Sequence, residues 1–123
     1  MAVTKSGTVY VLDAQGSKTH RANVYSFDGT SLTEFLPDVR VGYPSGLALG
    51  LDDKTLVISS LDATKGSASL LIIDIFSKEP SSLPTDGSLD TKFEPGGLHR
   101  ARNAQKFAWV SYDPAGASIY IAK

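Results

Sequence analysis

Three acidic residues at regular spacing are the first feature of this sequence that could carry chemistry. Asp13, Asp62 and Asp113 lie 49 and 51 residues apart, and each follows a short apolar run and precedes a glycine by three or four residues. Carboxylates from repeated units could converge on a hard divalent cation, which prefers several oxygen ligands. Alternatively, each Asp accepts a backbone N–H in its own turn, and the glycine supplies positive φ. Because the turn recurs in every unit, we favour the structural interpretation.

The segment LHRARNAQK, residues 98–106, is the strongest candidate for a binding site. It places His99, Arg100 and Arg102 where the preceding unit has the apolar and acidic sequence LALGLDDK. Two guanidinium groups can hold a carboxylate or a phosphate through paired hydrogen bonds. The alternatives are a solvated strand end or a salt-bridging surface against a partner. We predict that these three residues bind a ligand, together with Ser45 at the start of the corresponding strand of the preceding unit.

The other reactive side chains favour structural roles. His20 and His99 are too few for a three-histidine metal site, and their spacing indicates no Ser-His-Asp arrangement. The absence of cysteine excludes disulfides, thiolate catalysis and cysteine-ligated metals. Phe107, Trp109 and Tyr112 are interpreted as packing residues. We therefore predict no catalytic residue, no metal ligand and no cofactor.

The composition is that of one globular domain. The 123 residues are 41% hydrophobic and 20% charged, which is enough to build one core. Twelve basic and 13 acidic residues give a formal net charge of -1, which argues against nucleic acid or anionic membranes as partners. No stretch approaches the ~20 apolar residues of a membrane span. We expect a soluble protein, cytoplasmic if the chain is complete as given; the compartment is otherwise unknown.

The three Asp turns belong to a repeated β-hairpin. Apolar strands precede them (TVYVLD, TLVISSLD, FAWVSYD), and second strands follow (ANVYSFD, SASLLIIDI, ASIYIAK). The segments between hairpins, YPSGLAL and EPGGLHR, share Pro-x-Gly-Leu and lie 51 residues apart; Pro44 and Pro95 are expected to fix φ at the turn into this strand. Extended segments precede them, at 31–38 and within 81–94. Four strands per period of about 50 residues are typical of a β-propeller blade.

We predict an all-β, β-propeller-like fold of about two and a half to three four-stranded blades, that is, half a propeller. A single domain spans residues 1–123. Blade 1 covers about 1–38, blade 2 about 43–94, and blade 3, which is incomplete, about 95–123. The strands in chain order are b-c-d, a-b-c-d and a-b-c, with strand a nearest the propeller axis. The initial MAVTKSG is either a short strand a or pairs elsewhere.

A partial ring leaves two blade faces without a neighbour. Propellers close with typically four to eight blades, so that neighbouring blades cover both faces of each sheet. The most apolar strand, SLLIIDIF at 69–76, would promote aggregation if it lay at an exposed edge. We therefore predict self-association, most simply as a two-fold homodimer that builds a six-bladed ring, or completion by a complementary propeller half.

The sequence FLPDVRVGYPSGLALGLDDKTLVISS, followed by LLIIDI, resembles a blade of the gluconolactonase and senescence-marker-protein family, and more loosely of NHL-repeat propellers. The resemblance covers most of residues 8–123 and implies a propeller fold. Such families include calcium- or zinc-dependent lactonases and organophosphate hydrolases. Their metal lies in the central channel, on a Glu and on Asn or Asp side chains at the starts of the inner strands. The two matching positions here are Ser45 and Gly96, which depart from that ligand set.

Two functions are therefore expected from the sequence. The first is a non-catalytic binding or scaffold module. The second is part of a metal-dependent, gluconolactonase-type hydrolase that uses calcium or zinc as its cofactor. Ser45 and Gly96 favour the first, because a hydroxyl is a weak cation ligand and glycine has no side chain.

Overall fold

The structure is a computed structural model that describes residues 1–14, 21–41, 45–61, 68–84, 94–113 and 116–122. Within these ranges the chain forms strands and turns. Within the described residues there is no helix of the length and apolarity that a membrane span requires. The fold is all-β, which confirms the fold class predicted from the sequence.

The described strands form three antiparallel sheets, and in each sheet the strands follow one another in chain order. Blade 1 comprises β1 (Ala2–Val3), β2 (Val9–Ala14), β3 (Arg21–Phe27) and β4 (Leu32–Arg40). Blade 2 comprises β5 (Leu47–Leu49), β6 (Thr55–Leu61), β7 (Ala68–Asp74) and β8 (Pro80–Pro84). Blade 3 comprises β9 (Glu94–Arg100), β10 (Phe107–Asp113) and β11 (Gly116–Ala122).

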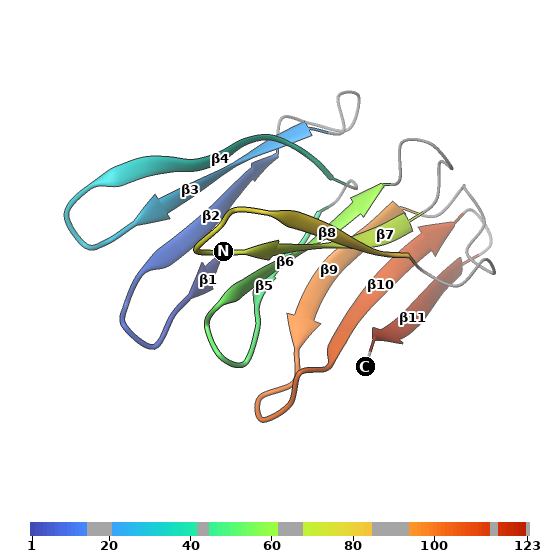
Figure 1. Ribbon diagram of the computed structural model, residues 1–123. Helices are drawn as coiled ribbons and strands as arrows, with labels where there is room; N and C mark the ends of the chain where they lie inside the picture. The colour runs from blue at the N-terminus through green and yellow to red at the C-terminus, as the bar shows by residue number, and fades with distance from the viewer. Residues whose placement is uncertain (15–20, 42–44, 62–67, 85–93, 114–115, 123) are drawn as a thin grey trace.

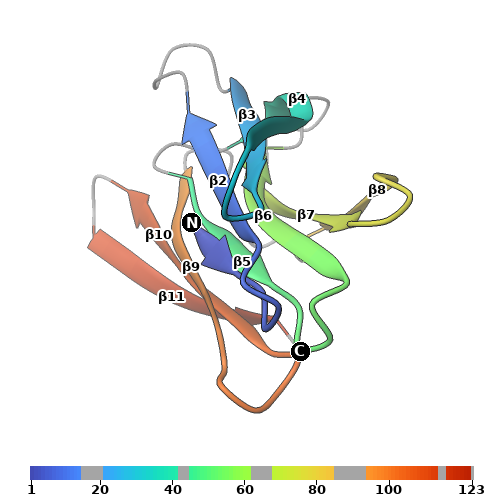
Figure 2. The same cartoon turned by 90° about the vertical axis from the view of Figure 1, so that its left-hand side faces the viewer.

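The three sheets are arranged as successive blades (Figure 1). In Figure 2 the inner strands β1, β5 and β9 lie together at the centre, whereas the outermost strands β4, β8 and β11 extend away from it in different directions. Two blades have four strands and the third has three. This is the arrangement expected of a partial propeller.

The first and third inner strands differ in detail from the sequence interpretation. The initial MAVTKSG contributes β1 as strand a of blade 1, since Ala2 pairs with Tyr10 and Val3 pairs with Val9. Pro95 lies inside β9, opposite Ser111, so the prediction that it occupies the turn before this strand is wrong. Its counterpart Pro44 lies outside the described residues.

The predicted b-to-c corners join β2 to β3, β6 to β7 and β10 to β11. Asp113 and Gly116 are paired directly across the third corner. Asp13 is an exposed residue near the end of β2. Asp62, and the turn residues that follow Asp13, lie outside the described residues, so the capping role predicted for the three Asp residues stays a prediction.

The middle blade buries side chains on both of its faces. One face packs on blade 1 and the other on blade 3, and the side chains alternate because neighbouring residues of a strand project to opposite sides. The face toward blade 1 contains Leu47, Leu49, Leu56, Ile58 and Ile73, which cluster with Tyr10, Ala22, Val24 and Val39. The face toward blade 3 contains Ala48, Val57 and Leu70, which cluster with Leu98 and Phe107.

The apolar strand β7 lies in the interior of blade 2. It is paired with β6 on one side and with β8 on the other, so its backbone forms no open edge. The SLLIIDIF sequence therefore marks a strand whose two faces are both covered, with Leu70 toward blade 3 and Ile73 toward blade 1. Full burial of such side chains stabilises the fold by about 1.5–3 kcal/mol each.

The inner strands of blades 2 and 3 approach very closely at Gly46. A Cβ atom built on Gly46 would lie 2.7 Å from the Leu98 Cβ and 3.1 Å from its Cα. The Gly46 N–H donates to the hydroxyl of buried Ser59 (2.7 Å), and the Ser59 N–H donates to the Gly46 carbonyl (3.1 Å). These bonds hold Gly46 beside Leu98, so the position has no room for a side chain.

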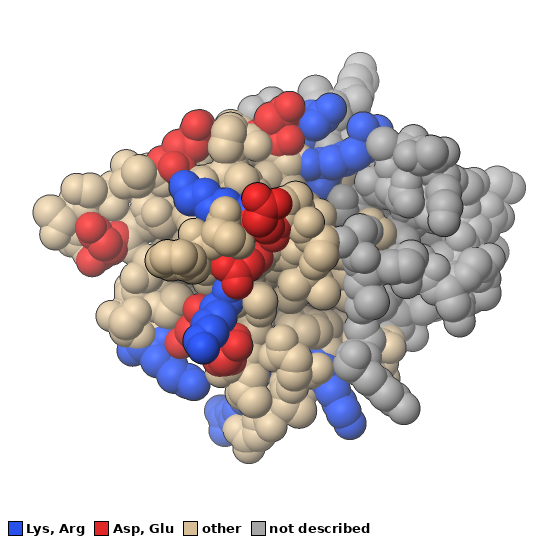
Figure 3. All heavy atoms as spheres, in the orientation of Figure 1, with Lys and Arg blue, Asp and Glu red and all other residues tan. Residues whose placement is uncertain are grey.

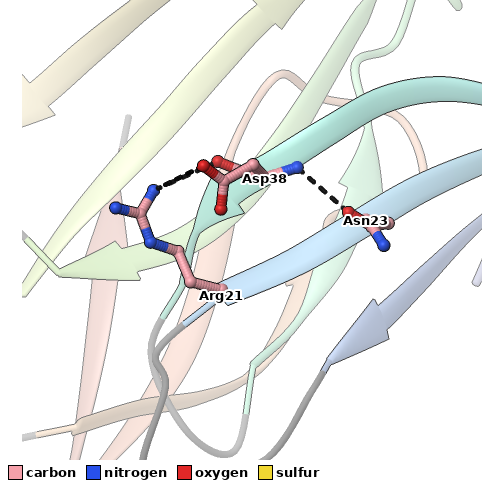
Figure 4. A network of polar contacts seen from close by, with 3 residues as sticks. All are labelled: Arg21, Asn23 and Asp38. Atoms are coloured by element: carbon pink, nitrogen blue, oxygen red, sulfur yellow. Dashed lines mark hydrogen bonds and ion pairs between the residues drawn. The ribbon is translucent and has the colours of Figure 1, made fainter.

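The outermost strand of blade 1 is irregular near its end. Asp38 has a φ of 53°, and its N–H donates to the Asn23 side-chain oxygen (3.0 Å). Arg21 forms an ion pair with the Asp38 carboxylate (3.4 Å) and donates to the Asp38 carbonyl (3.3 Å), as Figure 4 shows for the ion pair. The pairing of β3 with β4 shifts register in this region. A register shift of this kind is a β-bulge, which interrupts the regular pairing of the two strands and bends β4.

Two aspartates cap the turns between strands c and d. One carboxylate oxygen of Asp28 accepts the N–H groups of Thr30 and Ser31, both at 2.8 Å. Asp74 accepts those of Phe76 (3.0 Å) and Ser77 (2.8 Å) in the same way. The backbone bond from Ser31 chiefly lowers the pKa of Asp28, and the backbone bond from Ser77 chiefly lowers that of Asp74.

We predict that replacing Gly46 by alanine destabilises the fold by about 1–3 kcal/mol, because the added methyl group must displace the Leu98 backbone. Urea unfolding monitored by circular dichroism measures this change. Ser45→Ala, one residue earlier, is the control and is expected to change the free energy of unfolding by less than about 0.5 kcal/mol. Equal stability of the Gly46→Ala variant and the parent would contradict the close packing.

The capping aspartates predict a specific loss of stability in acid. Because folding lowers the pKa of Asp28 and Asp74, their contribution is present above the pKa of the unfolded chain and is lost as pH falls through the lower folded value. The Asp28→Asn, Asp74→Asn double variant keeps an acceptor oxygen but cannot titrate. Its unfolding free energy, measured in urea from pH 7 to pH 2.5, is expected to fall less steeply below pH 4 than that of the parent. Parallel profiles would refute the capping roles.

Candidate functional site

The turns between strands a and b gather at one end of the blades. They are 4–8 in blade 1, 50–55 in blade 2 and 101–106 in blade 3, and each is closed by a backbone hydrogen bond of 2.8–2.9 Å. Figure 1 shows these turns along the lower side of the molecule. The end of the predicted binding segment 98–106 therefore lies beside the corresponding turn of its neighbouring blade.

Side chains from blades 1 and 3 meet at the turn of blade 2. The Lys5 N–H donates to the Asp53 carboxylate (2.7 Å), and its ammonium donates to the Leu51 carbonyl (3.2 Å). From the other side, the Gln105 amide oxygen accepts the Leu51 N–H (2.7 Å). The backbone of Asp53 has a positive φ of 58°. Leu51 is thus bonded through its N–H to blade 3 and through its carbonyl to blade 1.

Arg100 joins the inner strands of blades 2 and 3. Its Nε donates to the Leu49 carbonyl at the end of β5 (2.7 Å). Its Nη1 donates to the carbonyls of Ala101 (2.6 Å) and Arg102 (3.2 Å), inside its own turn. The half-buried guanidinium is therefore bonded to three backbone oxygens. An anion that paired with Arg100 through Nε would have to displace the bond to Leu49, which joins blades 2 and 3.

The structure separates the other predicted ligand-binding residues from Arg100. His99 is exposed and pairs with Ala108; as the residue before Arg100 on the same strand, it projects to the opposite face of blade 3. Arg102 lies in the turn, and its side chain is exposed. Only its carbonyl contacts Arg100.

Ser45 lies at the opposite end of the inner strand. It is half-buried and precedes Gly46, whereas Arg100 contacts Leu49 at the end of β5. Four residues of extended chain span about 13 Å. Ser45, His99, Arg100 and Arg102 therefore do not form a single site. The binding of an anion by Arg102 and its neighbours stays a prediction.

Charged side chains are mixed over the described part of the surface. Figure 3 shows acidic and basic groups interspersed on the face of Figure 1, with no extended area of one sign. In the described residues, no group of three or more His, Asp or Glu side chains is placed to hold a metal ion. The backbone of Gly96 pairs with Val110 inside β9. The calcium or zinc cofactor of the alternative function stays a prediction.

Sequence reasoning missed the residues that connect the turns. Lys5, Asp53 and Gln105 carry no motif, because each acts through only one or two bonds to a neighbouring blade. A usable signal existed for the capping residues. Asp28 directly follows strand c of blade 1, Asp74 ends strand c of blade 2, and each precedes a serine by three residues. Comparison with protein-family models, with curated proteins and with solved structures finds no match for this chain.

We predict that Arg100→Ala lowers the free energy of unfolding by about 1.5–3 kcal/mol, the usual cost of losing hydrogen bonds from a charged group. Arg102→Ala is the matched control, since the same charge is removed from an exposed side chain; its expected effect is below about 0.5 kcal/mol. Urea unfolding of the two variants makes the comparison. Equal stabilities would show that Arg100 does not hold blades 2 and 3 together.

Proposed function

We propose that this chain is a non-catalytic β-propeller module that binds or scaffolds other molecules, and that further blades complete its ring. The observation that carries the proposal is an uncovered apolar row on the outer face of blade 1. The further blades come from a second copy of the chain or from a complementary propeller half. The two-fold dimer, with six blades in total, is the simplest form.

The apolar row crosses all four strands of blade 1. Val3 pairs with Val9, Val9 with Phe27 and Phe27 with Leu32, so the four side chains lie in line on one face. Their neighbour Tyr10 projects to the other face and is buried against blade 2. Val3 is 58% exposed, Phe27 37% and Leu32 65%. A contiguous exposed apolar strip of this kind is typical of an interaction surface.

The outer face of blade 3 offers a shorter apolar row. Ala108 pairs with His99 on one side and with Ile121 on the other, so these three residues share a face. Phe107 is the neighbour of Ala108 and is buried toward blade 2, which assigns the row to the side away from blade 2. Ile121 is 68% exposed. In the proposed dimer, this row of each copy packs on the apolar row of blade 1 of the other.

Two observations support a non-catalytic role. Ser45 and Gly96 replace the acidic or amide ligands that the resembling hydrolases use at the starts of their inner strands. Arg100, the best placed cation of the candidate site, is bonded to the Leu49 carbonyl of blade 2 and to two carbonyls of its own turn. The first feature removes the ligands of a catalytic metal, and the second gives Arg100 a role in joining two blades.

The ring proposal predicts a dimer that a charge in the apolar row dissociates. Sedimentation equilibrium at tens of micromolar should give twice the chain mass of 13.1 kDa. Leu32→Lys should shift the mass to that of the monomer, because a buried ammonium in the contact is costly.

Phe76→Lys is the matched control. Phe76 is 99% exposed in the turn between β7 and β8, outside the apolar row, so its replacement should leave the dimer intact. A parent chain that sediments as a monomer would contradict the second copy as the source of the missing blades. If both Leu32→Lys and Phe76→Lys dissociated the dimer, the dimer would be held by unspecific apolar contacts and not by the apolar row.

A further inference from the structure

We propose that the Asp28–Gly29 pair, in the turn between β3 and β4, is a site of spontaneous covalent modification, at which the folded chain slowly converts aspartate to isoaspartate. The proposal goes beyond the proposed function, because it concerns a reaction of the chain with itself and with water. Asp28 and Gly29 are both exposed, so water reaches the turn. The sequence contains one other Asp-Gly pair, Asp86–Gly87, which lies outside the described residues.

The reaction joins the Gly29 nitrogen to the side-chain carboxyl carbon of Asp28. A bond forms between this nitrogen and Cγ, and one carboxyl oxygen leaves as water with the proton of the carboxyl group and the proton of the nitrogen. The product is a cyclic imide, which a water molecule opens at either carbonyl carbon. Opening at Cγ restores aspartate. Opening at the backbone carbonyl carbon gives isoaspartate, in which the chain continues through Cβ and Cγ.

Three features leave the Gly29 nitrogen free to react. Gly29 has no side chain that could hinder the attack, and apart from its chain neighbours no atom lies within 4 Å of the position that a Cβ would take. No described residue accepts a hydrogen bond from its N–H. Its φ of 99° favours glycine, so the turn itself selects the residue type that permits the reaction.

The corresponding turn of blade 2 has the same cap without these features. Asp74 accepts two backbone N–H groups, as Asp28 does. The next residue is Ile75, whose stiff, β-branched side chain packs against the core between blades 1 and 2. The Ile75 N–H donates to the Lys54 carbonyl (2.9 Å) and is therefore occupied. We expect Asp74 to stay unmodified.

The cap slows the reaction at Asp28 in the folded chain. One oxygen of its carboxylate accepts the N–H groups of Thr30 and Ser31, both at 2.8 Å. These bonds, chiefly the one from Ser31, lower the pKa of Asp28 and keep its carboxyl group ionised. The ionised group reacts less readily, because water leaves only a protonated carboxyl group. The reaction therefore follows opening of the turn, and opening an exposed turn costs little free energy.

Isoaspartate at position 28 changes the hairpin of β3 and β4. It lengthens the backbone of the turn by one atom and moves the carboxylate away from the N–H groups that it caps. Phe27 and Leu32 pair directly beside this turn. We therefore expect the modified chain to unfold at a lower urea concentration than the unmodified chain.

Peptide mapping of aged samples tests the proposal on the 123-residue chain. The protein is stored for several weeks at neutral pH and body temperature, in buffer and in guanidinium chloride. Digestion, liquid chromatography and electron-transfer fragmentation then distinguish isoaspartate from aspartate. In buffer, isoaspartate is expected at position 28 and not at position 74. In denaturant, conversion at position 28 should be about tenfold faster, since no turn has to open, and should match conversion at position 86.

Asp28→Ser is the matched control. A serine hydroxyl can accept the same backbone N–H groups but has no carboxyl carbon that a nitrogen could attack. The parent should lose stability toward urea as isoaspartate accumulates, whereas the aged variant should keep the stability of a fresh sample. The comparison of Asp28 with Asp74 is made within the parent chain, so it does not depend on how well the variant folds.

Three results would overturn the proposal. The first is an unmodified Asp28 in buffer after the denatured chain has largely converted, which would mean that the folded turn prevents the reaction. The second is equal conversion of Asp28 in buffer and in denaturant, which would mean that the cap provides no restraint. The third is equal conversion of Asp28 and Asp74 in buffer, which would mean that the free nitrogen of Gly29 does not select the site.

Discussion

The packing of blade 2 between its two neighbours is the interaction on which the rest of the structure depends. A β-sheet has two faces, and burying both requires a layer on each side. Leu56 and Ile58 fill the contact with blade 1, while Val57 and Leu70 fill the contact with blade 3. The alternation along β6 divides one apolar run between two cores. The inner strands of blades 2 and 3 approach closely where Gly46, which has no side chain, lies beside Leu98.

Polar contacts at the turns fix how the blades sit relative to one another. Arg100 bonds to Leu49, and Leu51 is bonded to Lys5 on one side and to Gln105 on the other. Each bond links a backbone group to a side chain of the adjacent blade. Apolar packing alone is non-directional, so directional bonds at the ends of the sheets are what set the register between them. Within the segment 98–106, Arg100 and Gln105 make these contacts with blade 2.

Blades 1 and 3 each have only one face covered by a neighbouring blade. Blade 1 packs one face on blade 2 and leaves Val3, Phe27 and Leu32 exposed on the other face. Blade 3 leaves Ile121 exposed on the face away from blade 2. Face packing and edge pairing are separate physical demands, since one satisfies side chains and the other satisfies backbone groups.

The sequence by itself determined the all-β class, the repeated hairpins and the approximate order of the strands. Those features depend on local alternation and turn residues, and the Asp corners marked them correctly. Only the tertiary structure decided that Ser45 and Arg100 lie at opposite ends of the inner strands and that His99 projects away from Arg100. It also decided that the Arg100 guanidinium bonds to backbone oxygens of two blades. Residue types indicate what a side chain can bind, but its partner depends on which strands become neighbours in space, and here that was set by packing between blades.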